Sequence, residues 1–114
     1  MDNIYKIDVE SGALTVKEAL ATAEIELERA KICGLKLVKI VHGYGSKGVG
    51  GEIKKALLKH LEMLKKFNKI EDFCPCERFC FTHPNYKKYT KAHPNLLVDD
   101  NIKALNSGAT IVFL

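Results

Sequence analysis

The sequence contains no apolar run that approaches the roughly 20 consecutive residues needed to cross a membrane. Glycine and proline are scarce, with eight and three residues among 114, which excludes collagen-like and low-complexity chains. The first residues, Met1 to Asn3, lack the basic and apolar regions of a secretory signal. We therefore expect a globular cytoplasmic protein, and the length predicts a single domain over residues 1–114.

Acidic residues are nearly absent from the middle third of the chain. Residues 31–69 contain ten lysines and only two glutamates, whereas residues 1–30 contain seven acidic and three basic side chains. The whole chain has a formal net charge of +4, so positive charge is concentrated in this middle segment. Such a segment favours an anionic partner such as nucleic acid, because lysines beside phosphates release bound counterions. A solvated helix face is the alternative explanation.

The spacing of apolar residues predicts alternating strands and helices. The expected elements are a strand at 5–9, a helix at about 16–32, a strand at 35–41, a basic amphipathic helix from 52 through 67, and strands at 69–74 and 109–114. Thr15 and Glu18 form a capping box at the start of the first helix, and Gly34 is placed to end it. This βαβαββ order predicts an α/β (α+β) sandwich, in which a four-stranded mixed sheet is covered by two helices.

The glycine-rich stretch HGYGSKGVGG, residues 42–51, connects the second strand to the second helix. Glycine lets the backbone reach positive φ and lets a ligand approach closely. The loop joins the carboxyl end of a strand to a helix N-terminus, where free amides and the helix dipole favour an anion. The residues expected to bind phosphate or nucleic acid are Gly43, Tyr44, Gly45, Ser46, Lys47, Gly48 and Lys54.

The same loop matches the dinucleotide fingerprint GxGxxG at residues 43–48. The 63 residues after Gly51 are too few for the further βα units of a dinucleotide-binding fold. A binder of small nucleotides or phosphate is therefore a less favoured alternative. A P-loop is excluded, because Val49 follows Gly48 where that motif requires lysine.

The loop and its surroundings resemble the Smr (small MutS-related) domain family. Residues 42–45 are similar to the start of the family's HGxGxG motif, and residues 51–54 (Gly-Glu-Ile-Lys) to its Gly-x-Leu-Arg motif. Further segments resemble family motifs in the same order, namely Ile-Asp-Val at 7–9, Leu-Thr-Val-Lys-Glu-Ala at 14–19 and Gly-Ala-Thr-Ile-Val-Phe-Leu at 108–114. The resemblance implies a βαβαββ fold that binds DNA or RNA and, in many members, a metal-assisted endonuclease.

The resemblance also implies roles for single residues. Asp8 stands at the acidic position of the first motif, whereas Glu10 occupies the place where the family commonly has histidine. Asp8 and Glu10 could hold Mg²⁺ or Mn²⁺ through oxygen ligands, and His42 could act as acid or base in phosphodiester cleavage. A structural role for Asp8 in capping or orienting the His42 loop is the alternative. Because Glu10 replaces the family histidine, the alternative function is a module with weak or no catalytic activity that binds nucleic acid or a protein partner.

Residues 74–105 form an atypical insert that contains cysteine, histidine and tyrosine. Its possible zinc ligands are Cys74, Cys76, Cys80 and His83. Their CxC spacing is not a standard zinc pattern, so a buried strand cysteine and reduced thiols are the favoured interpretation. Tyr86, Tyr89 and neighbouring lysines could form a surface for single-stranded nucleic acid, or simply a polar loop.

Overall fold

The computed structural model describes residues 4–11, 15–43 and 50–114. The main elements are β1 (Tyr5–Asp8), α1 (Val16–Ile32), β2 (Leu37–Val41), α2 (Gly50–Lys66), β3 (Asp72–Pro75) and β4 (Ala109–Phe113). Between β3 and β4 lie the short helices η1 (Cys76–Arg78), α3 (Tyr86–Ala92), η2 (Pro94–Val98) and α4 (Asp100–Lys103). The predicted βαβαββ order is confirmed. β3 begins at Asp72 instead of 69 because its partner strand ends at Phe113, which lies opposite Asp72.

The ends of α1 are set by the residues that the sequence indicates. The Thr15 hydroxyl accepts from the Glu18 amide at 3.1 Å, and the Glu18 carboxylate accepts from the Thr15 amide at 3.1 Å, which is a capping box. Gly34 ends the helix with a φ of +79° and donates to the Lys31 carbonyl at 3.0 Å. Among the described residues, no helix has both the length and the apolar character that a bilayer span requires.

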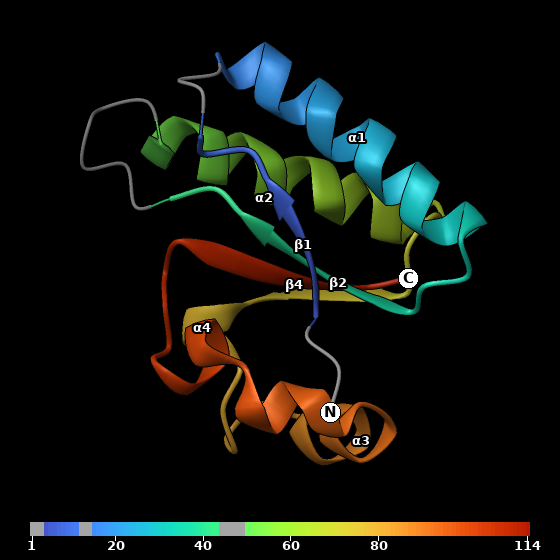
Figure 1. The fold of residues 1–114 in the computed structure, drawn as a ribbon, viewed down its shortest axis with the longest axis vertical. Coiled ribbons are helices and arrows are strands. Elements are labelled where there is room, and N and C mark those ends of the chain that lie inside the picture. Colours follow the sequence, from blue (N-terminus) through green and yellow to red (C-terminus); the bar gives the residue numbers. More distant parts are fainter. Residues whose placement is uncertain (1–3, 12–14, 44–49) are drawn as a thin grey trace.

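The sheet has the order β1-β2-β4-β3, with β1 parallel to β2 and β4 antiparallel to both of its neighbours. The connections through α1 and α2 therefore step across the sheet in the same direction. Because such crossovers are right-handed, both helices must lie on the same face, as Figure 1 shows. Val38, Ile40 and Val112 point to this face and pack in one core with both helices.

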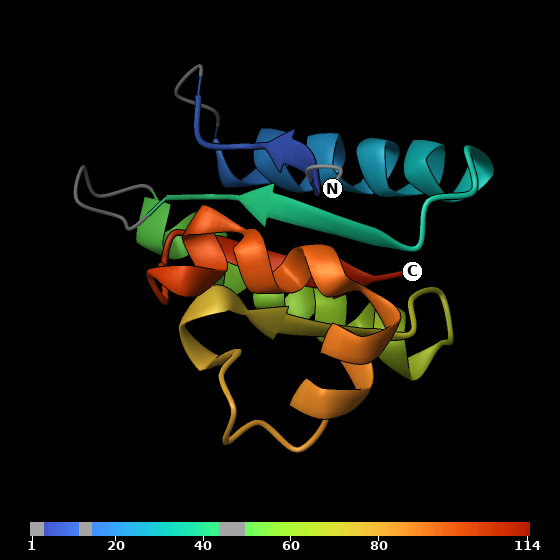
Figure 2. The same cartoon turned by 60° about the horizontal axis from the view of Figure 1, so that its bottom comes forward.

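The insert covers the opposite face of the sheet. Leu37, Ile111 and Phe113 alternate with the residues of the first core and therefore point away from α1 and α2. The insert supplies their buried apolar partners, which are Cys76, Phe79, Tyr89, Leu96 and Ile102. The Tyr89 ring stacks on Phe113 with a centroid separation of 3.8 Å. The insert is thus a third layer, in addition to the sheet and the layer of two helices that the sequence predicts (Figure 2).

One charged side chain links this third layer to the centre of the sheet. Lys39 lies in β2 and is buried, and its ammonium is 2.7 Å from the Asp99 carboxylate and 2.6 Å from the Asn101 side-chain oxygen. Asp99 also accepts from the Ile102 amide at 3.2 Å and so caps α4. Lys39 therefore holds the insert on the sheet, and its charge is not available to an anionic partner.

Candidate functional site

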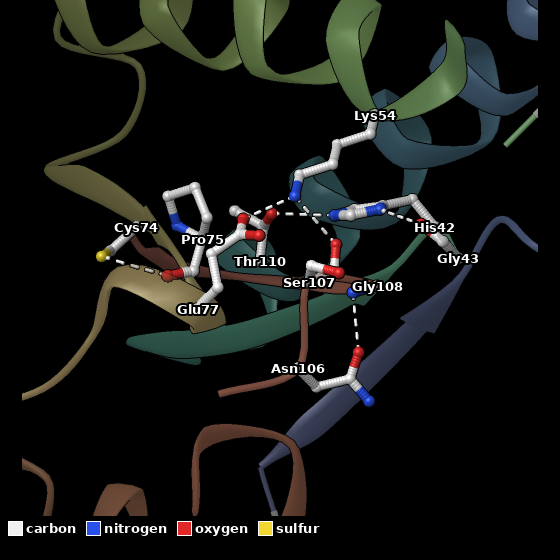
Figure 3. A network of polar contacts seen from close by, with 10 residues as sticks. All are labelled: His42, Gly43, Lys54, Cys74, Pro75, Glu77, Asn106, Ser107, Gly108 and Thr110. Carbon is white, nitrogen blue, oxygen red and sulfur yellow. Dashed lines mark hydrogen bonds and ion pairs between the residues drawn. The ribbon is translucent and has the colours of Figure 1, made fainter. Parts of the chain in front are cut away.

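Polar groups from five elements meet at one edge of the sheet. β1 and β2 end there, α2 begins there, and the segment before β4 and the helix η1 complete the edge. We define the strand-edge site by the described residues Glu10, His42, Gly43, Lys54 and Gly108, most of which Figure 3 shows together. The expected phosphate-binding residues Tyr44, Gly45, Ser46, Lys47 and Gly48 lie outside the described residues.

His42 is completely buried, and both of its ring nitrogens have partners. Nδ1 lies 3.0 Å from the Gly43 carbonyl oxygen, and Nε2 lies 2.9 Å from the Thr110 hydroxyl. Because a carbonyl can only accept, Nδ1 carries the hydrogen and Nε2 accepts from Thr110. Burial lowers the pKa of His42, and the Lys54 charge lowers it further, against the opposing effects of Gly43 and Glu77. The ring is therefore neutral at pH 7, and it could accept a substrate proton only after releasing the Thr110 hydroxyl.

Two glycines allow the turn after β2 to contact the turn before β4 directly. The amides of His42 and Gly43 both donate to the Gly108 carbonyl at 2.9 Å. A Cβ atom on Gly108 would lie 3.3 Å from the Cα of Gly43, so a larger residue would push the two turns apart. Gly43 has a φ of +81°, which favours glycine. The backbone at this edge is consequently fixed by its own hydrogen bonds.

The carboxylate at the end of β1, Asp8, and the one just after it, Glu10, have different surroundings. Asp8 Oδ1 accepts from the amides of Glu10 at 2.9 Å and Ser11 at 3.0 Å, and Oδ2 accepts from the Ser11 hydroxyl at 2.8 Å. Hydrogen bonds from Ser11 hold the pKa of Asp8 below its usual value. The Glu10 carboxylate instead lies against Gly43, where an added Cβ would come 2.9 Å from its Cδ. Asp8 thus orders the turn that places Glu10 beside the glycine turn.

Lys54 in the first turns of α2 is held by two acceptors. Its ammonium lies 2.5 Å from Glu77 Oε1 and 2.9 Å from the Ser107 carbonyl oxygen (Figure 3). The two side chains of this ion pair are 22% and 31% exposed. Sequence analysis missed Glu77, because no motif or periodicity marks it within the insert. Thr110 could have been noticed as the only polar side chain in the terminal strand.

The possible zinc ligands do not converge. Cys74 and Cys76 are buried, and burial raises the pKa of both thiols to about 12. Cys80 contacts the Thr82 hydroxyl at 3.0 Å, and His83 Nδ1 accepts from the Asn85 amide at 3.1 Å. In the part of the chain that the structure describes, no three His, Cys, Asp or Glu side chains are grouped to hold a metal ion. Cys74 is a buried strand residue, in agreement with the favoured interpretation of the sequence.

The tyrosines of the insert belong to its core. Tyr89 is 4% exposed and stacks on Phe113, while the half-buried Tyr86 ring lies 5.1 Å from the ring of Phe79. The Tyr89 hydroxyl donates to Asp72 at 2.8 Å. A buried ring cannot stack on a nucleic-acid base, so the Tyr89 part of the proposed single-strand surface does not form.

The exposed surface of α2 is more basic than that of α1. Lys55, Lys59 and Lys66 are exposed, and their spacing places them on one side of α2, with the exposed Glu62 between Lys59 and Lys66. The neighbouring helix α1 has a mixed surface, in which Glu18, Glu24 and Glu28 are exposed together with Lys17, Arg29 and Lys31. Lys65 lies beside the basic row and pairs with Asp72 at 3.0 Å. An extended anion would therefore be attracted more strongly to α2 than to α1.

Comparisons with known proteins agree with this architecture. The family model described as "Smr domain" matches residues 12–114. The crystal structure of the Smr domain of Thermus thermophilus MutS2 is similar, with a TM-score of 0.56 and 23% sequence identity over 97% of this chain and 98% of that chain. At that identity the likeness is one of fold, and a comparison with curated proteins found no match. The family match covers most of the sequence, so the chain belongs to the Smr domain family, whose members generally bind nucleic acids.

Proposed function

We propose that the protein binds DNA or RNA along the exposed face of α2 and at the strand-edge site. The observation that carries this proposal is the row of exposed lysines Lys55, Lys59 and Lys66, which starts in the first turns of α2. Consecutive phosphates can pair with such a row, and each pairing releases counterions. The proposal agrees with the family to which the chain belongs.

Three other lysines of the middle third have ion-pair partners within the fold. Lys39, Lys54 and Lys65 pair with Asp99, Glu77 and Asp72. Their charges are partly or fully compensated, so they contribute less to the attraction of an anion. The exposed lysines of α2 are therefore a source of positive potential in this segment, together with the exposed Lys31, Lys36 and Lys69.

Replacement of Lys55, Lys59 and Lys66 by glutamine should weaken oligonucleotide binding by about tenfold. The slope of log K against log salt should become shallower by the equivalent of about two to three phosphate contacts. Lys87, Lys88 and Lys91 provide a matched control, because they are equally exposed on α3, on the opposite side of the sheet. Their triple replacement by glutamine should leave the salt dependence unchanged. Fluorescence anisotropy over a salt series measures both variants with labelled single-stranded and duplex DNA and RNA.

Several outcomes would contradict this assignment. A larger loss in the α3 variant than in the α2 variant would move the interface to the insert. Tight binding of free nucleotides would instead favour the small-ligand alternative. Absence of salt-dependent binding to every oligonucleotide would leave a protein-interaction module as the remaining function.

Metal-assisted phosphodiester cleavage is a second candidate function, and the observation that favours it is the position of Glu10. Its carboxylate lies against Gly43, the residue after His42. Mg²⁺ commonly binds through one or two carboxylates together with substrate phosphates. Glu10 would be the main ligand here, because both oxygens of Asp8 already accept hydrogen bonds from Glu10 and Ser11. Bound in that way, Mg²⁺ or Mn²⁺ would neutralise the charge that develops on the phosphate.

The chain's own residues would then have distinct tasks in cleavage. His42 would exchange its Thr110 hydrogen bond for a proton of the attacking water, since its ring is neutral. Asp8 would hold the Glu10 turn, and Glu10 would face the phosphate. The bonds that His42 already makes favour binding without efficient cleavage as the alternative.

Cleavage that depends on Glu10 should be lost in Glu10→Gln and strongly reduced in Gly43→Ala, because an alanine Cβ displaces the Glu10 carboxylate. Gly34→Ala is the matched control: its φ is +79°, and no atom lies within 4 Å of the added Cβ. Both alanine variants should lose about 1–2 kcal/mol of unfolding free energy from the positive φ, but Gly34→Ala should still cut. Plasmid DNA and structured RNA incubated with Mg²⁺, Mn²⁺ or EDTA provide the assay.

The same assay identifies an inactive domain. Cutting that continues in EDTA, or that survives Glu10→Gln, would remove Glu10 and the divalent ion from the mechanism. Absence of any cutting, together with normal oligonucleotide binding, would leave the protein as a binding module.

A further inference from the structure

The insert places the negatively charged Glu77 beside Lys54, the lysine of the strand-edge site. Glu77 follows β3 directly, in η1, and reaches across the edge of the sheet to Lys54 on α2. The two residues are 23 positions apart in the sequence. This ion pair joins the insert to the site (Figure 3), whereas the apolar core of the insert packs on the face of the sheet opposite α1 and α2.

The surroundings of Lys54 show what the pair does to an incoming anion. An ammonium group has three donors, and two of them point to Glu77 and to the Ser107 carbonyl. Glu77 compensates the lysine charge, so a phosphate near Lys54 meets both the cation and the carboxylate. Since both side chains are partly exposed, water and ligands can reach the pair and exchange its partners.

We propose that Glu77 restrains the strand-edge site, because its carboxylate competes with a nucleic-acid phosphate for Lys54. The inference rests on the proposed function, since it concerns the affinity of the same site for nucleic acid. It makes the insert a determinant of affinity in addition to a layer of the fold.

Two roles of Glu77 predict opposite signs of the effect. If the carboxylate holds Lys54 in a productive position, removal of its charge weakens binding. If the carboxylate competes with phosphate, removal strengthens binding. The geometry favours competition, because the Ser107 carbonyl at 2.9 Å continues to position Lys54 when Glu77 is neutral. Glutamine also retains an oxygen that can accept from Lys54.

The test compares wild type, Glu77→Gln, Lys54→Gln and the double variant in oligonucleotide binding over a salt series. Glu77→Gln should bind about three- to fivefold tighter than wild type. Its dependence of log K on log salt should steepen by about one phosphate contact, which corresponds to a slope change of about 0.7–0.9. The double variant should lose both gains. Glu71→Gln is the matched control, because Glu71 is exposed, lies just before β3 and pairs only loosely with Lys88 at 3.8 Å.

The outcomes separate this inference from the proposed function. Unchanged or weaker binding by Glu77→Gln, with normal binding by wild type, overturns the competition alone. An equal gain in Glu71→Gln also overturns it, because the effect would then be one of net charge. Binding by none of the proteins overturns both proposals, whereas binding by Glu77→Gln alone supports the restraint directly.

Discussion

Replacement of Phe113 by alanine should lower the free energy of unfolding by about 3–5 kcal/mol, the usual loss for a large buried aromatic side chain. Phe113 is 1% exposed and lies on the insert side of β4. Its ring stacks on Tyr89 at 3.8 Å and lies 6.0 Å from His93 and 6.4 Å from Phe79. Removal of the ring therefore leaves a cavity between the sheet and three parts of the insert. Urea denaturation followed by circular dichroism measures the change.

Phe81 provides the control for this substitution. It lies in the same insert but is 84% exposed, so Phe81→Ala should change the stability by less than about 0.5 kcal/mol. Limited proteolysis adds a local measurement, because Phe113→Ala should expose the insert to cleavage before α1 and α2 are attacked. Equal stability of the two variants would show that the insert does not depend on the sheet for its packing.

Replacement of Lys39 by alanine should cost about 3–5 kcal/mol, because it leaves the Asp99 carboxylate buried without its cation. The side chains of Lys39 and Asp99 are only 10% and 9% exposed. Lys36→Ala, one residue before β2 on an exposed side chain, should change the stability by less than about 0.5 kcal/mol. The same denaturation measurement compares the two variants.

A double substitution distinguishes the buried charge from the loss of packing. Lys39→Met together with Asp99→Asn removes both charges, keeps the volume of the long side chain and leaves an asparagine that can cap α4. This variant should regain a large part of the stability that Lys39→Ala loses. If it is as unstable as the single variant, the ionic interaction is not the main contribution of Lys39.

The part of the fold that sequence predicted is the part built from local patterns. Thr15, Glu18 and Gly34 act within one helix, and their roles can be recognised because capping depends on residues a few positions apart. The right-handed rule for crossovers then placed both long helices correctly. The covering of the second face was not predicted, because α3, α4, η1 and η2 are too short to show a helical period.

The sequence could not predict the ion-pair partners of the lysines at and near the site, because these partners are far apart in the chain. Lys39 and Asp99 are 60 positions apart, and Lys54 and Glu77 are 23 apart. Nothing in a list of lysines indicates which charge will be compensated after folding. Conversely, Cys74, Cys76 and Cys80 are close in the sequence, but Cys74 and Cys76 are buried in the core on the insert side of the sheet, whereas Cys80 is half-buried and contacts the Thr82 hydroxyl. His42, Gly43, Glu10 and Lys54 could be anticipated as neighbours because strand ends and helix starts share one edge.

The position of β4 also determines the order in which the domain can assemble. β4 is the last strand in the sequence, yet it lies inside the sheet and separates β2 from β3. During synthesis, the ribosome can release β1, α1, β2 and α2 as a connected unit, since domains often begin to fold from their N-terminal part. β3 pairs with β4 among the described strands, so β3 and the insert must wait until residue 113 has emerged. The nascent chain therefore carries an unfinished hydrophobic surface until its final strand closes the sheet.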